Sequence, residues 1–372
     1  MRIGVYTHPL HLNYGGILQA YAMQRVLQDM GHDAVYIDWM PYQFKLLPIK
    51  TYFWRFLCKL KWLGRREIDV FFDFNFRYNQ AYKKINKFAK SNIQIHLIDS
   101  LEQLKEDDVD VLIVGSDQIW RPIYIENIAD AYLGFAKDWD VRRIAYAASF
   151  GVDDWSEYSD EQTQVCRELI KKFDAVSVRE DSGVDLCRNY LGVDAQHVLD
   201  PTMLVDIKHY IRHINSCKKR YSERMCLAYI LDEADDKLAV LNSVAKYQGY
   251  NVRQWKNVDV PNIKNPTVEE WLKGFHDAEF VFTDSFHGCV FSIIFNKPFI
   301  AFGNEGRGMA RFDSLLKMFG LEELLITSLE QFTPELVDRA ILRFSDNSIQ
   351  QRLNELRKGS YEFLKSALEG MK

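Results

Sequence analysis

The fold is decided by the opening stretch, residues 2–38, which reads RIGVYTHPLHLNYGGILQAYAMQRVLQDMGHDAVYID. A short apolar run over 2–6 is followed by a segment of helical periodicity that ends at Gly31, and a second apolar run occupies 34–38. A strand, a helix and a strand in this order predict a βαβ unit with parallel strands. The chain therefore opens as an α/β domain.

The same alternation continues in two series, which the polar stretch 215–224 separates. Further strand-like runs lie at 110–117, 142–151, 175–180 and 195–204 in the first series, and at 225–232, 251–255 and 279–285 in the second. We therefore predict an α/β protein of two domains, over 1–205 and 206–345, with a C-terminal helix over 346–372. A ligand is expected in the cleft between the domains.

The segment 41–90 interrupts the first domain. It is crowded with aromatic and basic residues and has helical rather than strand periodicity, so we predict a helical insertion. Two interpretations are open: an element that makes peripheral contact with a membrane or an acceptor, and an amphipathic hairpin that packs on its own domain.

The composition is that of a globular protein and excludes several classes. At about 150 residues per domain, 372 residues suggest two domains. A net charge of -5 argues against a role in coating nucleic acid. The six cysteines show neither a CxxC pair nor zinc-ligand spacing, which favours a reducing cytoplasm. Neither an export signal nor a membrane span is predicted, and no compact ligand cluster indicates a metal.

Residues that follow strands are the site candidates, because open parallel sheets bind ligands beyond the carboxyl ends of their strands. The first group joins the first strand to the first helix, where backbone amides and a helix dipole favour an anion. The alternative is a tight turn that needs glycine. This group consists of Asn13, Tyr14, Gly15 and Gly16.

The second group consists of Ser116, Asp117, Gln118 and Trp120, which follow the strand-like run that begins at 110. We expect Asp117 and Gln118 to bind sugar hydroxyls and Trp120 to offer an apolar face to a sugar ring. An N-cap for the next segment is the alternative for Ser116 or Asp117.

The third group is Arg179 and Glu180, at the end of another buried strand. An arginine in this position is suited to holding a carboxylate or phosphate through two nitrogens. The alternative is a structural ion pair between the two side chains.

The fourth group begins with His287 and Gly288, where the strand at 279–285 gives way to a helix. The imidazole is expected to project into the cleft, and the alternative is a capping or core histidine. The glycine-rich loop after the next strand adds Arg307 and Arg311. It either wraps an anion or is solvated.

Six stretches together resemble the polysaccharide pyruvyl transferase family. They read NYGGILQAYAMQ, DVLIVGSDQIW, AYAASFG, SVRED, VLDPTML and TDSFHGCVFSIIFNKPFI, and they lie in this order between 13 and 300. The resemblance implies two Rossmann-like domains facing a cleft, as in glycosyltransferases of the GT-B type. It also implies transfer of a pyruvyl group from phosphoenolpyruvate to sugar hydroxyls of a cell-surface polysaccharide precursor, often as a cyclic ketal. The acceptor would be a sugar or a lipid-linked oligosaccharide, and no cofactor would be needed. The lack of a predicted export signal and membrane span places the reaction in the cytoplasm.

The resemblance also suggests roles for individual residues. The family's functional histidine matches His287, as the proton donor to the enol or as a phosphate ligand. Asp284 would orient His287 or act as a base, and capping of the following helix is its alternative. Arg179, Arg307, Arg311 and the turn at Gly15 would meet the donor's carboxylate and phosphate. Several characterised members carry an arginine two residues before the histidine, where this chain has Ser285.

Two other functions compete with this one. A glycosyltransferase would use a nucleotide sugar in the same cleft, although the sequence NYGG is not the GxGxxG fingerprint of dinucleotide sites. A non-catalytic protein would bind an anionic glycan there without turnover.

Overall fold

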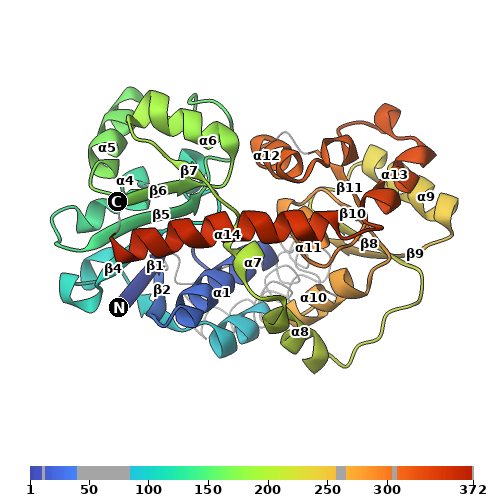
Figure 1. Ribbon diagram of the computed structural model, residues 1–372, viewed down its shortest axis with the longest axis horizontal. Coiled ribbons are helices and arrows are strands. Elements are labelled where there is room, and N and C mark those ends of the chain that lie inside the picture. Colours follow the sequence, from blue (N-terminus) through green and yellow to red (C-terminus); the bar gives the residue numbers. More distant parts are fainter. Residues whose placement is uncertain (11–12, 40–83, 257–264, 304–307, 371–372) are drawn as a thin grey trace, which may run out of the picture.

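The computed structural model describes residues 1–10, 13–39, 84–256, 265–303 and 308–370. It contains two parallel sheets, each flanked by helices, which lie side by side and are crossed by one long helix (Figure 1). The predicted α/β fold with two Rossmann-like domains is confirmed. Of the predicted insertion over 41–90, the part up to 83 lies outside the described residues, and 84–92 are helical.

The first domain is built on a seven-stranded sheet in the order β3-β2-β1-β4-β5-β6-β7. Helix α1 (Tyr14–Asp29) connects β1 to β2, and the strand order changes direction between β1 and β4. Such a switch leaves a crevice at the carboxyl ends of the two strands. The strands are β1 (Arg2–Tyr6), β2 (Asp33–Trp39), β3 (Ile95–Ile98), β4 (Val111–Val114), β5 (Arg142–Ala148), β6 (Ala175–Val178) and β7 (Gln196–His197).

The second domain has a five-stranded sheet in the order β12-β11-β10-β8-β9. Its order changes direction between β8 and β10, and α11 (Phe286–Ile294) follows β10 directly. Helix α11 has no charged residue and is buried along its whole length, so only its N-terminus is available to a ligand. The strands are β8 (Met225–Ile230), β9 (Asn251–Lys256), β10 (Phe280–Thr283), β11 (Phe299–Phe302) and β12 (Leu325–Ile326).

Amphipathic helices cover the sheets, and two of them begin with a capping box. Ser159 caps α5 together with Gln162, and Thr267 caps α10 together with Glu270. The remaining helices are α4 (Ile128–Ala131), α5 (Asp160–Ile170), α6 (Asp181–Leu186), α7 (Pro201–Leu204), α8 (Ile207–Ser216), α9 (Asp235–Gln248), α10 (Val268–Asp277), α12 (Ala310–Phe319) and α13 (Pro334–Arg343). None of the described helices is both long and apolar enough to cross a membrane.

The C-terminal helix α14 (Ser348–Glu369) contacts both domains (Figure 1). Near its start, Gln350 Nε2 donates to the carbonyl of Ile293 in α11 at 2.7 Å. Further along, Ser360 Oγ accepts from the backbone amide of Leu199 at 3.0 Å. The helix therefore begins on the second domain and ends on the first, so it packs on both rather than on one.

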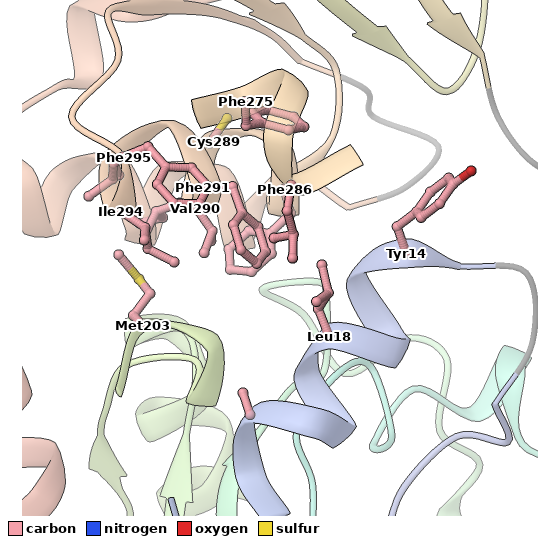
Figure 2. Close-up of a cluster of buried hydrophobic side chains, with 14 of the residues drawn as sticks. Tyr14, Leu18, Met203, Phe275, Phe286, Cys289, Val290, Phe291, Ile294 and Phe295 are labelled. Carbon is pink, nitrogen blue, oxygen red and sulfur yellow. The ribbon is translucent and has the colours of Figure 1, made fainter. Parts of the chain in front are cut away.

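An apolar interface joins the domains beneath their cleft. Figure 2 shows Leu18 of α1 near Phe286 of α11, and Met203 of α7 near Ile294, and all belong to one buried cluster. Tyr14 adds a polar link, because its hydroxyl donates to the carbonyl of Pro266 at 2.6 Å. Burial of side chains of this size contributes roughly 1.5–3 kcal/mol each.

Candidate active site

A cavity of about 630 Å³ lies between the domains and is open to solvent. Its volume is within the usual range for small-molecule sites. The walls come from the segments that follow β1, β4 and β10, together with α1 and α12. The residues are Thr7, His8, Pro9, Asn13, Gly16, Ile17, Gln19, Asp117, Gln118, Ile123, Tyr124, Ile125, Glu126, Leu231, Asp284, Ser285, Phe286, His287, Arg311 and Phe312.

Two helix N-termini meet at this cavity. Asn13 caps α1 and accepts from the amide of Gly15 at 3.0 Å, while Ser285 caps α11 and accepts from the amide of Gly288 at 3.4 Å. A Cβ atom at Gly15 would lie 2.1 Å from Nδ1 of His287, so only glycine allows α1 to approach the imidazole. Both helices direct their positive dipole ends and free amides to the same place, which favours an anion.

His287 lies in the first turn of α11 with only 6% of its surface exposed. Its Nε2 has no hydrogen-bond partner among the described residues, and the carboxylate oxygen Oδ2 of Asp200 is 3.8 Å away. Burial lowers the pKa of His287, as do the charges of Arg179 and Arg311, against the opposing effect of Asp200 and Asp117. The imidazole is therefore neutral at pH 7 and has one ring nitrogen available to a ligand.

Asp200 is a site residue that the sequence analysis missed. Its Oδ1 accepts from the amide of Thr202 at 2.9 Å, which makes it the N-cap of α7. Its Oδ2 accepts from Arg179 Nη1 at 2.8 Å and from Ser116 Oγ at 3.2 Å. Aspartate before proline is a common helix start. The motif VLDPTML therefore predicts that Asp200 caps a helix, but it does not predict the bonds of Asp200 to Arg179 and Ser116.

Arg179 was predicted to bind an anionic ligand, but its side chain is buried and holds neighbouring carboxylates in place. Its side chain is 1% exposed and forms ion pairs with Asp200 at 2.8 Å and with Asp117 at 3.5 Å. Its guanidinium also lies 4.5 Å from the ring centroid of Phe286. These contacts hold two carboxylates of the first domain against α11 of the second domain.

Arg311 reaches the cavity from the first turn of α12, with its guanidinium 5.6 Å from the ring centroid of Phe286. Burial and the neighbouring Arg179 lower its pKa to about 10, so the side chain stays charged at neutral pH. Among the described residues that line the cavity, Arg311 is the only lysine or arginine. The other predicted cation of this loop, Arg307, lies outside the described residues.

Asp117 lines the cavity beside Gln118, as predicted for a polar ligand site. Burial acts to raise the pKa of Asp117, but the charges of Arg179, His8 and His287 outweigh it and lower the pKa well below its usual value. The carboxylate is therefore ionised and serves as a hydrogen-bond acceptor. Ser116 is fully buried and contributes through Asp200 rather than by facing the cavity.

The expected sugar platform at Trp120 is wrong. Trp120 is fully buried, its Nε1 donates to the carbonyl of Ala131 at 3.0 Å, and its ring stacks on Tyr132 with centroids 4.9 Å apart. The indole therefore belongs to the core of the first domain. Tyr124, four residues along the chain, lines the cavity.

Glu180 also has a structural role and does not face the cavity. Its Oε1 accepts from Ser149 Oγ at 2.9 Å and from the amides of Phe150 and Gly151 at 2.7 and 2.8 Å. The side chain is fully buried and fixes the loop after β5. The alternative of an Arg179–Glu180 pair is thus replaced by the pairs of Arg179 with two aspartates.

Asp284 borders the cavity, but donors from the second domain occupy both of its oxygens. Oδ1 accepts from the amide of Leu231 at 2.6 Å, and Oδ2 accepts from the amide of Asp232 at 3.1 Å and from Lys237 Nζ at 2.7 Å. The carboxylate therefore fixes the loop after β8. Helix α11 is capped by Ser285 and not by Asp284.

Gly288 and Tyr14 support the site from behind. A Cβ atom at Gly288 would lie 2.2 Å from Thr283 Oγ1, so glycine lets α11 start close to β10. The ring of Tyr14 is fully buried and stacks on Trp271 with centroids 5.7 Å apart. No three His, Cys, Asp or Glu side chains of the described residues gather as metal ligands.

Similar structures share the fold at low sequence identity. A putative UDP-N-acetylglucosamine 2-epimerase from Listeria monocytogenes is 9% identical with a TM-score of 0.52, over 100% of this chain and 97% of that chain. The UDP-GlcNAc 2-epimerase from Methanocaldococcus jannaschii is 11% identical with a TM-score of 0.50, over 92% of each chain. No curated protein matches the sequence significantly.

The sequence itself matches a protein family over most of its length. The family model described as polysaccharide pyruvyl transferase aligns with residues 13–306. This range contains Asn13 and Gly15 at the start of α1, Asp117 and Asp200 of the first domain, and His287 at the start of α11. The chain belongs to the polysaccharide pyruvyl transferase family.

Proposed function

We propose that this protein transfers a pyruvyl group from phosphoenolpyruvate to hydroxyls of a sugar in a cell-surface or exopolysaccharide precursor, forming a pyruvate ketal. The observation that carries the proposal is the close approach of the N-terminus of α1 to the ring of buried His287 at the N-terminus of α11, where Nε2 has no hydrogen-bond partner among the described residues. An anion that also needs a proton fits this place, and phosphoenolpyruvate is such an anion.

The donor site consists of amides and one cation. The first turn of α11 offers backbone amides and the hydroxyl of Ser285, and α1 offers the turn at Gly15 and Gly16. Arg311 supplies the positive charge from α12, in place of the arginine that several family members carry at the position of Ser285. Arg311 would balance part of the charge of a bound phosphate and carboxylate, and the amides would donate hydrogen bonds to their oxygens.

Proton transfer would be the task of His287. The imidazole is neutral in the free protein, and a bound phosphate and carboxylate would raise its pKa toward neutrality. Protonation of the enol methylene makes the neighbouring carbon electrophilic, and a sugar hydroxyl then adds to it. The first hydroxyl returns its proton to His287. Loss of inorganic phosphate and addition of a second hydroxyl to the same carbon then close the ketal, and the proton of the second hydroxyl leaves with the phosphate. The ionised Asp117 accepts a hydrogen bond from an acceptor hydroxyl, and the carboxylate of Asp200, 3.8 Å from Nε2, would stabilise the imidazole when it carries a proton.

The cellular setting forms part of the proposal. Phosphoenolpyruvate is a cytoplasmic metabolite, so the reaction belongs to the cytoplasmic stage of glycan assembly. The acceptor would be a sugar or a lipid-linked oligosaccharide. No cofactor would be required, because the donor is already activated at its enol carbon.

The deciding experiment is isothermal titration of phosphoenolpyruvate into the full chain and into His287→Ala, with UDP-N-acetylglucosamine as the competing ligand. We expect saturable binding of phosphoenolpyruvate that weakens at least tenfold in the variant. The matched control is Thr163→Ala, which lies on α5 and should bind as the parent does. Binding of the nucleotide sugar alone would replace the proposal by the glycosyltransferase function. Binding of neither would also contradict it.

The substitution Ser285→Arg tests the placement of the donor. If the donor phosphate lies at the N-terminus of α11, the added charge should tighten phosphoenolpyruvate binding. Unchanged affinity would place the donor elsewhere in the cavity.

A further inference from the structure

The mouth of the cavity differs from its interior. It is formed by the short 3₁₀ turn η3 (Pro122–Tyr124) and the next two residues. Ile123 is 59% exposed and Tyr124 is 46% exposed. Two adjacent exposed apolar side chains that also line a polar cavity are candidates for contact with a ligand.

The ring of Tyr124 is held in place without a ligand. The guanidinium of Arg121 lies 5.2 Å from its centroid, and His8 meets it edge-on with centroids 6.4 Å apart. Arg121 is fixed in turn by Glu157, through Nη2 at 2.8 Å and Nε at 3.0 Å, and by Gln118 Oε1 at 3.1 Å. A preordered aromatic face loses little conformational entropy when a ligand stacks on it.

The polar groups around this ring define the chemistry of a ligand. Glu126 and Gln118 line the same cavity, and both can accept hydrogen bonds from hydroxyls. Glu126 adds a negative charge to this cavity, and Glu157 pairs the charge of Arg121, which disfavours a phosphate or a carboxylate there. An uncharged pyranose fits, because it presents an apolar C–H face to a ring and hydroxyls at its edge.

We propose that Tyr124 is the platform on which an uncharged hexopyranose ring of the acceptor stacks, with Glu126 and Gln118 receiving its hydroxyls. This inference rests on the proposed function in one respect, since it assigns the sugar to the acceptor of that transfer. Tyr124 would then bind the acceptor, and Arg311 and His287, which line the same cavity, would bind the donor.

The test measures sugar binding without turnover. Saturation-transfer difference NMR would be recorded on the full chain with three probes: methyl β-D-glucopyranoside, methyl β-D-galactopyranoside and methyl β-D-mannopyranoside. We expect at least one probe to receive saturation at its ring C–H protons. Tyr124→Ala should weaken that probe roughly five- to tenfold, and Tyr124→Phe should restore the stacking. Loss of binding in Tyr124→Ala alone would also follow from misfolding, so thermal melting of each variant accompanies the titration.

Tyr247 provides a matched control. It is also 46% exposed, but its hydroxyl donates to Asp338 on the surface of the second domain, and Tyr247→Ala should bind the probe as the parent does. Equal binding by Tyr124→Ala, or no binding of any probe by the parent, would overturn the inference. Sugar binding that depends on Tyr124 in a protein that ignores phosphoenolpyruvate would instead overturn the proposed function and leave the platform standing.

Discussion

The interior and the mouth of the cavity are built in opposite ways. The interior joins side chains of both domains into one network, in which the side chains of Arg179 and Asp200 are each 1% exposed and that of His287 is also buried. The mouth consists of one turn of the first domain with exposed side chains. Groups that perform chemistry must be fixed before the ligand arrives, whereas a single turn can change its sequence without disturbing the fold. If the proposed function is correct, substitutions in the interior should change the chemistry, and substitutions at the mouth should change the choice of acceptor.

The largest expected effect comes from His287→Gln, which removes the titratable group of the interior and keeps its size. Phosphate release from phosphoenolpyruvate and an acceptor should fall about 10²- to 10⁴-fold, the usual contribution of a general acid. Glycoside binding at the mouth should persist in NMR. A loss of less than tenfold in turnover would show that the imidazole is not the proton donor.

Asp284→Ala should act on stability, because it leaves Lys237 buried without its carboxylate. Lys237 and Asp284 are 7% and 0% exposed, and removal of one partner of such a pair costs about 3–5 kcal/mol. Urea unfolding of the full chain measures this change. The double variant with Lys237→Met should recover part of the loss, and a change below about 1 kcal/mol would mean that the pair is not a structural anchor.

Gly15→Ala tests whether the interior depends on contact between the domains. The new methyl group would lie 2.1 Å from the His287 ring, so the imidazole or helix α1 must move, and turnover should fall on the order of 10²-fold. Gly359→Ala in α14 is the matched control, since its Cβ would have no neighbour within 4 Å. A melting temperature that falls in Gly15→Ala but not in Gly359→Ala would show that the helices separate. Similar behaviour of both variants would contradict the close approach.

The smallest expected effect is a pH dependence of donor affinity. Burial lowers the pKa of His287 in the free protein, and a bound anion raises it, so binding takes up a proton between these two values. Affinity for phosphoenolpyruvate should therefore fall as pH rises through that window, by no more than tenfold per pH unit. Titrations in two buffers of different ionisation enthalpy measure the uptake. His287→Gln retains only the titration of the donor's own phosphate, and an identical slope would exclude His287 as the group.

Sequence patterns predicted the fold well, because strands buried on both faces of a parallel sheet are continuous apolar runs. They also predicted that His287, Asp117 and Arg311 meet, since all follow strands whose carboxyl ends face one cleft. Which aromatic side chain faces the cleft was less predictable: Trp120 and Tyr124 lie in one segment, and only tertiary packing selects the exposed one.

The charged residues show a second limit. The sequence around Asp200 indicates a helix cap and gives no sign of its place in the site. Arg179 was expected to bind a ligand, but its partners are Asp117 and Asp200, which lie in distant segments. Hydrogen bonds between residues far apart in the chain leave no local pattern. For the same reason the sequence could not show that Asp284 is held by Lys237.

The long helix α14 has a consequence for biosynthesis. Residues of α14, which are synthesised much later, hold the segment that carries Asp200. The amide of Leu199 donates to Ser360, 161 positions along the chain, and Arg357 donates to the carbonyl of Met203. The first domain therefore emerges from the ribosome before the helix that holds this segment has been synthesised. The segment around Asp200 gains these contacts only after both domains have been translated, so a chain truncated before α14 should hold Asp200 less firmly.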